Sequence, residues 1–326
     1  MDRRHHPSNT RRALVALGTT CALTLPLALG AASHSEDLMQ PVEGDHVIEN
    51  FGFHTGETIP EMVVHYRTIG DPGGAPMLIL HGTTGNGDGM RAAFPRYNYV
   101  DMVKAQHAML TEDLGIDRLR VIVGNSMGGM LAWTWAVEYP GYMDAIVPMA
   151  SLPAAMSGRN WMMRRMVIDA VRTDPAWMNG DYEEQPPNLR TQSAWFGLAT
   201  SGGNQALQAA GATREAADKV VDDKLANQKV GDANDTMYRR DASRDFDPSG
   251  ELGEIEAHVL VINSADDERN PPELGILERE MPKVANAQVY IIPGSPETRG
   301  HGTTGGRSAL WADRLAEFLA SVPEGP

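Results

Sequence analysis

The clearest chemical signal in this sequence is Ser126, which lies in the segment Gly124-Asn125-Ser126-Met127-Gly128. An apolar, β-branched run precedes it, and a helix-forming run follows it. Glycines two positions before and after the serine leave space for a strained strand-turn-helix bend that lifts the hydroxyl above a sheet. The N-terminus of the following helix favours negative charge beside that hydroxyl. The pattern therefore predicts a nucleophilic serine.

A serine hydroxyl is a weak nucleophile at neutral pH, so it needs a base to accept its proton and an acid to orient the base. Where such a bend occurs, the chain order is serine, then acid, then histidine. Two histidines follow Ser126, namely His258 and His301. Because His258 opens a predicted strand and His301 lies in a glycine-lined loop after the last predicted strand, His301 is the predicted base.

The acid is expected in the loop 264–269, which follows the strand predicted over 258–263 and offers Asp266, Asp267 and Glu268. Spacing alone does not select one of them. We prefer Asp267, with Asp266 second. The alternative is a solvated acidic turn that pairs with Arg269 or caps a following helix.

Acyl transfer also requires two backbone N–H groups that face the developing oxyanion. Met127, directly after the serine, is predicted to supply one. Thr83 is predicted to supply the other, because it lies in the glycine-rich segment 81–85 at the end of an early strand.

These residues require a set of strands and helices to position them. The segment 47–69 predicts an antiparallel pair with a turn around Gly56 and Pro60. Strands and helices then alternate, which favours a mostly parallel, doubly wound sheet. We expect strands over 76–80, 119–123, 145–149, 258–263 and 287–292, and helices over 99–114, 127–138 and 308–320.

Between residues 151 and 254 the alternation gives way to helical segments separated by Pro and Gly. We interpret this region as a helical cap inserted between two parts of one core, 45–150 and 255–322. The many Met and Trp residues of the cap are expected mainly to pack it against the core.

Composition limits the partners. The formal charge of −15, from 43 acidic and 28 basic residues, repels a phosphate backbone, so no nucleic acid is expected. The single cysteine, Cys21, lies in the N-terminal leader, which leaves no disulfide, thiolate metal site or cysteine nucleophile in the mature chain. No metal-binding, phosphate-loop or dinucleotide pattern occurs, so no cofactor and no metal are expected.

The first 32 residues resemble a secretory signal peptide. Two arginine pairs precede an apolar run over 13–29, and small residues around Ala32 allow cleavage there. Arg11-Arg12 resembles a twin-arginine signal. We expect export to the periplasm or the outside of the cell, with no stable membrane insertion after cleavage. An uncleaved anchor is the alternative, but threonines and a proline within the run disfavour it.

Nearly all of the mature sequence resembles the homoserine O-acetyltransferase-like branch of the α/β hydrolases. The resemblance implies an α/β-hydrolase fold and places the nucleophile at Ser126 and the histidine at His301. In that branch the acid stands four residues before the first proline of a pair, which selects Asp267. The matching segments begin at residues 81, 94, 114, 156, 266 and 300.

Two departures from that branch have consequences. Leu131 replaces the glutamine of the transferases, and no acceptor-binding arginine can be placed in the cap. An exported enzyme also meets little acetyl-CoA, so water is the expected acyl acceptor.

The second departure concerns the core. Gly82 and Leu119 are 37 positions apart, whereas a helix, a strand and a second helix need about 45 residues or more. A central strand near Gly89 is therefore expected to be missing. Either the segment 62–69 closes the resulting gap in the sheet, or the chain is a defective gene product.

The sequence thus predicts an exported serine hydrolase that cleaves a small ester through an acyl-Ser126 intermediate. The alternatives are an O-acyltransferase of the homoserine O-acetyltransferase type, for which the partner is an acyl donor, and an inactive protein that only binds a ligand. A homodimer remains open.

Overall fold

The structure is a computed structural model that describes residues 40–82 and 94–325. The chain divides into a small unit, residues 1–42 with 68–71, and a main unit, residues 43–67 with 72–326. Of the small unit, 40–42 and 68–71 are described. The five-stranded sheet and every site described below belong to the main unit. The predicted signal peptide lies outside the described residues.

A parallel five-stranded sheet forms the centre of the main unit, with its strands in the order β3-β4-β5-β6-β7. All neighbouring pairs are parallel, as the alternation of strands and helices predicted. The carboxyl ends of the strands therefore lie along one edge of the sheet. The strands are β3 (Met77–Leu80), β4 (Leu119–Asn125), β5 (Met143–Met149), β6 (His258–Ser264) and β7 (Ala287–Ile292).

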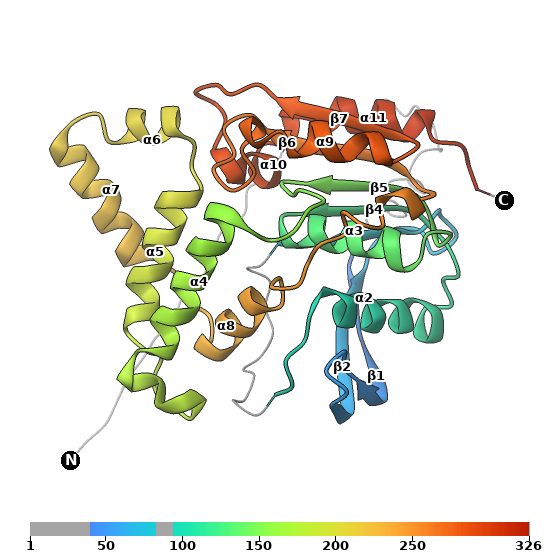
Figure 1. The fold of residues 1–326 in the computed structure, drawn as a ribbon, viewed down its shortest axis with the longest axis horizontal. Coiled ribbons are helices and arrows are strands. Elements are labelled where there is room, and N and C mark those ends of the chain that lie inside the picture. Colours follow the sequence, from blue (N-terminus) through green and yellow to red (C-terminus); the bar gives the residue numbers. More distant parts are fainter. Residues whose placement is uncertain (1–39, 83–93, 326) are drawn as a thin grey trace, which may run out of the picture. The chain divides into compact units, whose positions relative to one another are not determined.

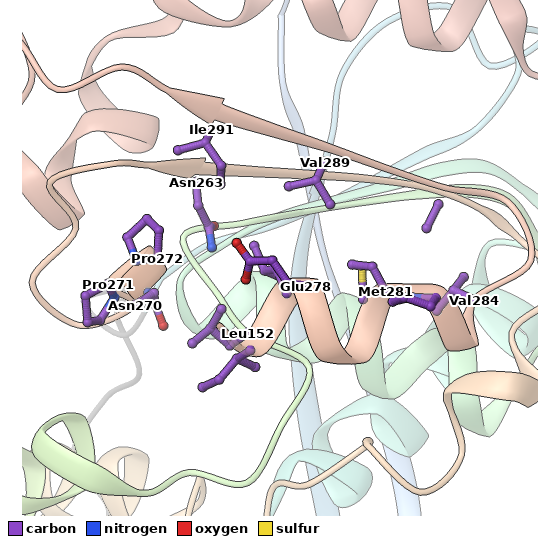
Figure 2. A pocket seen from close by; sticks show the side chains of 14 residues that line it. Leu152, Asn263, Asn270, Pro271, Pro272, Glu278, Met281, Val284, Val289 and Ile291 are labelled. Carbon is purple, nitrogen blue, oxygen red and sulfur yellow. The ribbon is translucent and has the colours of Figure 1, made fainter. Parts of the chain in front are cut away.

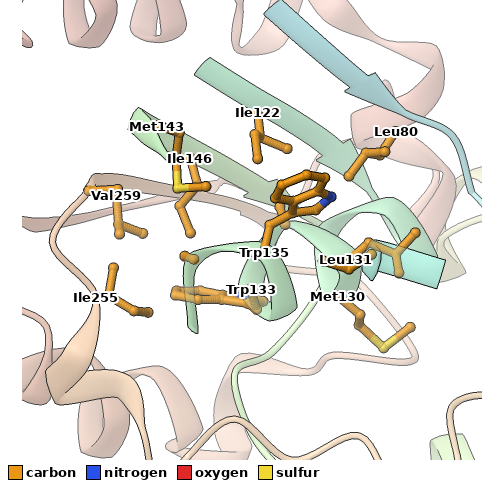
Figure 3. Close-up of a cluster of buried hydrophobic side chains, with 14 of the residues drawn as sticks. Leu80, Ile122, Met130, Leu131, Trp133, Trp135, Met143, Ile146, Ile255 and Val259 are labelled. Carbon is orange, nitrogen blue, oxygen red and sulfur yellow. The ribbon is translucent and has the colours of Figure 1, made fainter. Parts of the chain in front are cut away.

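The central strands bury both of their faces, because helices cover the sheet on each side. One face carries Ile122, Ile146 and Val259, which pack with helix α3 (Met127–Glu138) in the largest apolar cluster (Figure 3). The opposite face carries Val123 and Leu260, which pack with helix α11 (Ala312–Ser321). Alternating side chains in each strand thus build two apolar layers.

Helix α3 lies almost wholly inside this core, and Trp133 and Trp135 are both fully buried. Its fixed position matters for the site because the helix begins directly after Ser126. The remaining helices of the core are α2 (Tyr99–Ala108), which continues as a π-helical turn over Met109–Asp113, α9 (Ile276–Glu280) and α10 (Thr303–Gly306).

The early segment forms a separate two-stranded sheet of β1 (Val42–Gly52) and β2 (Thr58–Thr68). The pairs Glu43 with Arg67 and Asp45 with His65 show that the strands are antiparallel, as predicted. The turn over 53–57 contains Gly56, but Pro60 lies inside β2 and not in the turn. Proline is tolerated there because the strand has a free edge among the described residues.

No strand among the described residues lies between β2 and β3. The expectation that 62–69 closes the gap in the sheet is therefore wrong, because β2 pairs with β1 and is not hydrogen-bonded to β3. The predicted deletion near Gly89 falls outside the described residues. In the described part of the chain, β3 is an edge strand with 72% of Ile79 exposed.

Helices occupy the region predicted as a cap, and Figure 1 shows them grouped beside the layered core. Val167, Val171, Leu189 and Phe196 form an apolar cluster of their own within this group. No helix in the described ranges is long and apolar enough to cross a membrane. The cap helices are α4 (Gly158–Arg172), α5 (Asn188–Thr200), α6 (Asn204–Ala210), α7 (Arg214–Asn227) and α8 (Ala233–Asp241).

Candidate active site

Ser126 occupies a strained turn between β4 and α3. Its φ is 57° and its ψ is −111°, a combination that few non-glycine residues adopt. The glycines on either side permit the turn because a Cβ on Gly124 would overlap the Gly128 carbonyl, and one on Gly128 would overlap the Leu80 carbonyl. The predicted strand-turn-helix bend is therefore present, with the serine at the carboxyl edge of the sheet.

The structure brings the three predicted side chains together in a hydrogen-bonded row. The Ser126 Oγ lies 2.8 Å from the His301 Nε2. The His301 Nδ1 lies 2.9 Å from Asp267 Oδ2 and 3.0 Å from Oδ1. Because an ionised carboxylate only accepts hydrogen bonds, the Nδ1 carries the proton and the Nε2 is free to accept from the serine hydroxyl.

The charges around the row keep Asp267 ionised and His301 neutral. Burial alone would raise the pKa of Asp267, but the His301 imidazole and hydrogen bonds from Asn270 and the Arg269 N–H lower it to about 2. Burial lowers the pKa of His301, and the Arg269 guanidinium lowers it further against the opposing effect of Asp267. A neutral imidazole beside a serine hydroxyl is the state that accepts a proton.

The loop after β6 fixes the carboxylate of Asp267. Its Oδ1 accepts the backbone N–H groups of Arg269 at 2.8 Å and Asn270 at 3.1 Å, and its Oδ2 accepts the Asn270 side-chain amide at 3.0 Å. That amide also donates to the Ala150 carbonyl at 2.9 Å. Asn270 therefore ties the acid to the end of β5.

The other two acidic candidates hold the histidine loop in place. Asp266 accepts hydrogen bonds from the Thr298 hydroxyl at 2.7 Å and the Gly300 N–H at 3.2 Å. Glu268 accepts the His301 backbone N–H at 3.0 Å. Neither carboxylate is hydrogen-bonded to the imidazole, so of the three acidic candidates only Asp267 contacts the His301 ring in this way.

Sequence reasoning missed the residues that support this row. Asn270 follows Asp267 by three positions, a spacing at which an aspartate accepts backbone N–H groups in a turn. That spacing was a usable signal for Asn270. By contrast, Asn125 and Thr304 are 179 residues apart, and their side chains bond at 2.6 Å between the serine turn and the histidine loop. No local signal predicts that contact.

One of the two expected oxyanion donors can be located. Met127 is the first residue of α3, where a backbone N–H has no partner within the helix. Thr83 lies outside the described residues. Gly82, directly before it, lies beside Ser126, since a Cβ on Gly82 would be 3.7 Å from the Ser126 Cβ.

A cavity of about 710 Å³ lies between the start of the cap and the acid loop. Met130, Arg159, Asp267 and Arg269 are among its lining residues. Its walls therefore include the acid itself and a residue one helical turn beyond the nucleophile.

Three buried or half-buried arginines lie near the row without a carboxylate partner in the described part of the chain. Arg164 donates to Asn160 and Ser243, and Arg269 to Thr200 and Ser201. Arg240 and Arg269 lie over the ring of Phe196, at 5.2 and 4.6 Å from its centre. Burial, with these neighbouring guanidiniums, lowers the pKa of Arg240 to about 9.

The sequence of this chain is similar to those of several known proteins. The sequence pattern of the alpha/beta hydrolase fold matches residues 82–296. A protein from Methanothermobacter thermautotrophicus named "Probable acyltransferase" is 27% identical over 271 residues, which cover 70% of this chain and 83% of the relative. A homoserine O-acetyltransferase from Nautilia profundicola is 34% identical over 151 residues, covering 44% of this chain and 38% of the relative.

Solved structures show the same fold. A homoserine O-acetyltransferase from Bacillus anthracis matches with a TM-score of 0.75 and 19% identity, covering 88% of this chain and 100% of the other. Esterase E22 matches with a TM-score of 0.74 and 17% identity, covering 86% and 100%. At these identities the likeness concerns the fold, which hosts hydrolysis and acyl transfer alike.

Proposed function

Because this chain belongs to the alpha/beta hydrolase fold family and resembles homoserine O-acetyltransferases within it, we propose that it is a serine hydrolase that cleaves a small ester. The observation that carries the proposal is the row of hydrogen bonds from Ser126 through His301 to Asp267. An ionised acid, a neutral base and a hydroxyl in this order are what acyl transfer to serine requires.

In the first half of the reaction the Ser126 Oγ attacks the ester carbonyl carbon while the His301 Nε2 takes the hydroxyl proton. The Met127 N–H stabilises the oxyanion that develops on the carbonyl oxygen. When the ester C–O bond breaks, the Nε2 gives its proton to the leaving alcohol. Asp267 stabilises the imidazolium that exists between these two transfers.

In the second half, water replaces the alcohol. The Nε2 removes a proton from the water as its oxygen attacks the acyl carbon, and returns that proton to the Ser126 Oγ as the acid leaves. Ser126 and His301 are 6% and 8% exposed, so a substrate has to enter a largely enclosed site, which favours small acyl groups.

A fluorophosphonate probe tests the nucleophile directly. We expect the wild-type protein to be labelled at Ser126, with no labelling in Ser126→Ala and a loss of at least about a hundredfold in rate in His301→Ala. The control is Thr111→Ala, a change at an intrahelical hydroxyl of α2 and its π-helical extension. Absence of labelling in folded wild-type protein would leave the inactive, ligand-binding alternative standing.

Acyl transfer to an alcohol is the second candidate, and the names of the sequence relatives favour it. The same acyl-Ser126 intermediate serves both reactions, so the acceptor distinguishes them. With p-nitrophenyl acetate as the donor, we expect acetate as the product whether or not homoserine is added. Formation of O-acetylhomoserine in preference to acetate would reverse the assignment.

We also propose that the protein is exported, on the strength of the arginine-rich and apolar leader alone. N-terminal sequencing of the protein recovered outside the cytoplasm should begin at Ser33, after cleavage behind Ala32. A product that starts at Met1 in the cytosol or in the membrane fraction would contradict export with cleavage.

A further inference from the structure

A second cavity, of about 500 Å³, lies between α9 and the sheet face formed by β6 and β7 (Figure 2). Neither Ser126 nor His301 lines it. It shares Leu152, Asn270, Pro271 and Ile276 with the wall of the larger cavity beside the acid loop. Its size falls within the range of small-molecule sites, and the proposed esterase reaction has no use for it.

The lining of this cavity is mostly aliphatic. Val289 and Ile291 extend from β7, and Met281 faces them from the turn after α9 (Figure 2). Leu277 of α9 also lines the cavity. Such walls favour a ligand with an alkyl chain, since each methylene buried there contributes about 0.8 kcal/mol to binding.

Two amide side chains line the cavity. The Asn263 Oδ1 accepts a hydrogen bond from the Ser151 N–H, and its Nδ2 donates one to the Ser151 carbonyl. The Asn270 Nδ2 donates hydrogen bonds to the Ala150 carbonyl and to the Asp267 carboxylate. The Asn270 Oδ1 accepts no hydrogen bond from the described residues. A ligand with a hydrogen-bond donor would satisfy that oxygen.

Glu278 supplies the charge. It is the single charged residue of the lining, its side chain is exposed, and its carboxylate points into the cavity (Figure 2). It forms no ion pair with the described residues. The net charge of the chain, −15, adds a general attraction for cations.

From these contacts we infer that this cavity, here called the α9 cavity, binds a small primary alkylammonium ion. The ammonium group pairs with Glu278, and the alkyl chain lies between α9 and β7. Binding requires no chemistry at Ser126, so it stands or fails separately from the proposed esterase activity.

Calorimetric titration of the full-length protein with butyl-, hexyl- and octylammonium tests this inference. Affinity should rise about tenfold for each two methylenes, and Glu278→Gln should weaken octylammonium binding about tenfold. Glu215→Gln, an exposed change on α7, is the matched control and should leave binding unchanged.

Filling the cavity gives an independent test. Val289→Trp places an indole where the alkyl chain would lie and should abolish binding, whereas Val221→Trp on α7 should not; the two valines are 41% and 43% exposed. The inference is overturned if octylammonium fails to bind up to about 10 mM. It is equally overturned if Glu278→Gln and Val289→Trp, shown to be folded by circular dichroism, bind octylammonium as wild type does.

Discussion

His301 lies among charges that oppose one another, and the balance decides its protonation. Burial and Arg269 lower its pKa from 6.5, while Asp267 raises it, and the net shift is downward. The folded state therefore binds this proton more weakly than the unfolded chain does. The contribution of His301 to the free energy of unfolding is lost as the pH falls below about 6.5, because the unfolded chain then takes up the proton first.

The same shift predicts the pH dependence of activity. Proton acceptance from Ser126 needs neutral His301, so kcat/KM should decline on the acid side with a midpoint below pH 6.5. A pH–rate profile on a neutral acetate ester measures this midpoint. In Asp267→Asn the rate should fall by several orders of magnitude, since an amide no longer holds the proton on the His301 Nδ1 and the Nε2 is not left free to accept one. A midpoint above 6.5 in the wild type would contradict the electrostatic account.

Arg240 is a residue whose charge costs stability. Its Nε is buried without a hydrogen-bond partner, and no carboxylate of the described chain pairs with it. Arg240→Met removes the cation, including its contact with the Phe196 ring, and leaves an apolar side chain of similar length. We expect the free energy of unfolding to rise by about 1 kcal/mol or more, measured by urea denaturation.

The matched control for Arg240 is Arg165→Met on α4, where an exposed arginine pairs with Asp169 at 2.8 Å. That substitution should change stability by at most about 0.5 kcal/mol and should not stabilise the protein. If both variants lose stability, the Arg240 guanidinium has hydrogen-bond or charged partners in solution, and the prediction is wrong.

At the scale of elements, the contact between β3 and α3 sets the position of the nucleophile. Gly128 lets the helix approach so closely that a Cβ there would overlap the Leu80 backbone carbonyl. Because backbone cannot yield as a side-chain tip can, Gly128→Ala should lower stability by about 3 kcal/mol or prevent folding. Thermal unfolding followed by circular dichroism measures the effect.

Gly141→Ala is the control for this close approach. Its added Cβ would meet its nearest neighbour, a Glu256 oxygen, at 3.9 Å, which is ordinary contact distance. We expect a change below about 0.5 kcal/mol. Equal losses in both glycine variants would show that the β3–α3 approach is not the limiting contact.

At the scale of the whole molecule, β3 is an edge strand of the central sheet among the described residues. Ile79 is 72% exposed and Met77 is 51% exposed on this strand, and an apolar edge favours pairing between molecules. Ile79→Lys should leave the melting temperature nearly unchanged and reduce aggregation on concentration, as measured by light scattering. Ile122→Lys, in the buried central strand, should instead unfold the protein.

The sequence by itself determined the repeating order of strands and helices and the turn that carries Ser126. Strand β7 and helix α3 begin and end where the pattern predicted, because buried runs and glycine turns are local signals. The serine turn was equally local, since five consecutive residues specify it. The choice of Asp267 also came from the sequence, through the resemblance of the proline pair after it to a known family.

Only the tertiary structure decided how those residues are held. The hydrogen bond from the Asn270 side chain to the Ala150 carbonyl joins segments that are distant in the chain. The same is true of the bonds from the His301 backbone to Glu268 and from Thr304 to Asn125. The three arginines that have no carboxylate partner among the described residues depend equally on packing, as does the lack of hydrogen bonding between β2 and β3. The spacing of apolar residues indicates whether a segment is buried. It does not indicate which other segment packs against it.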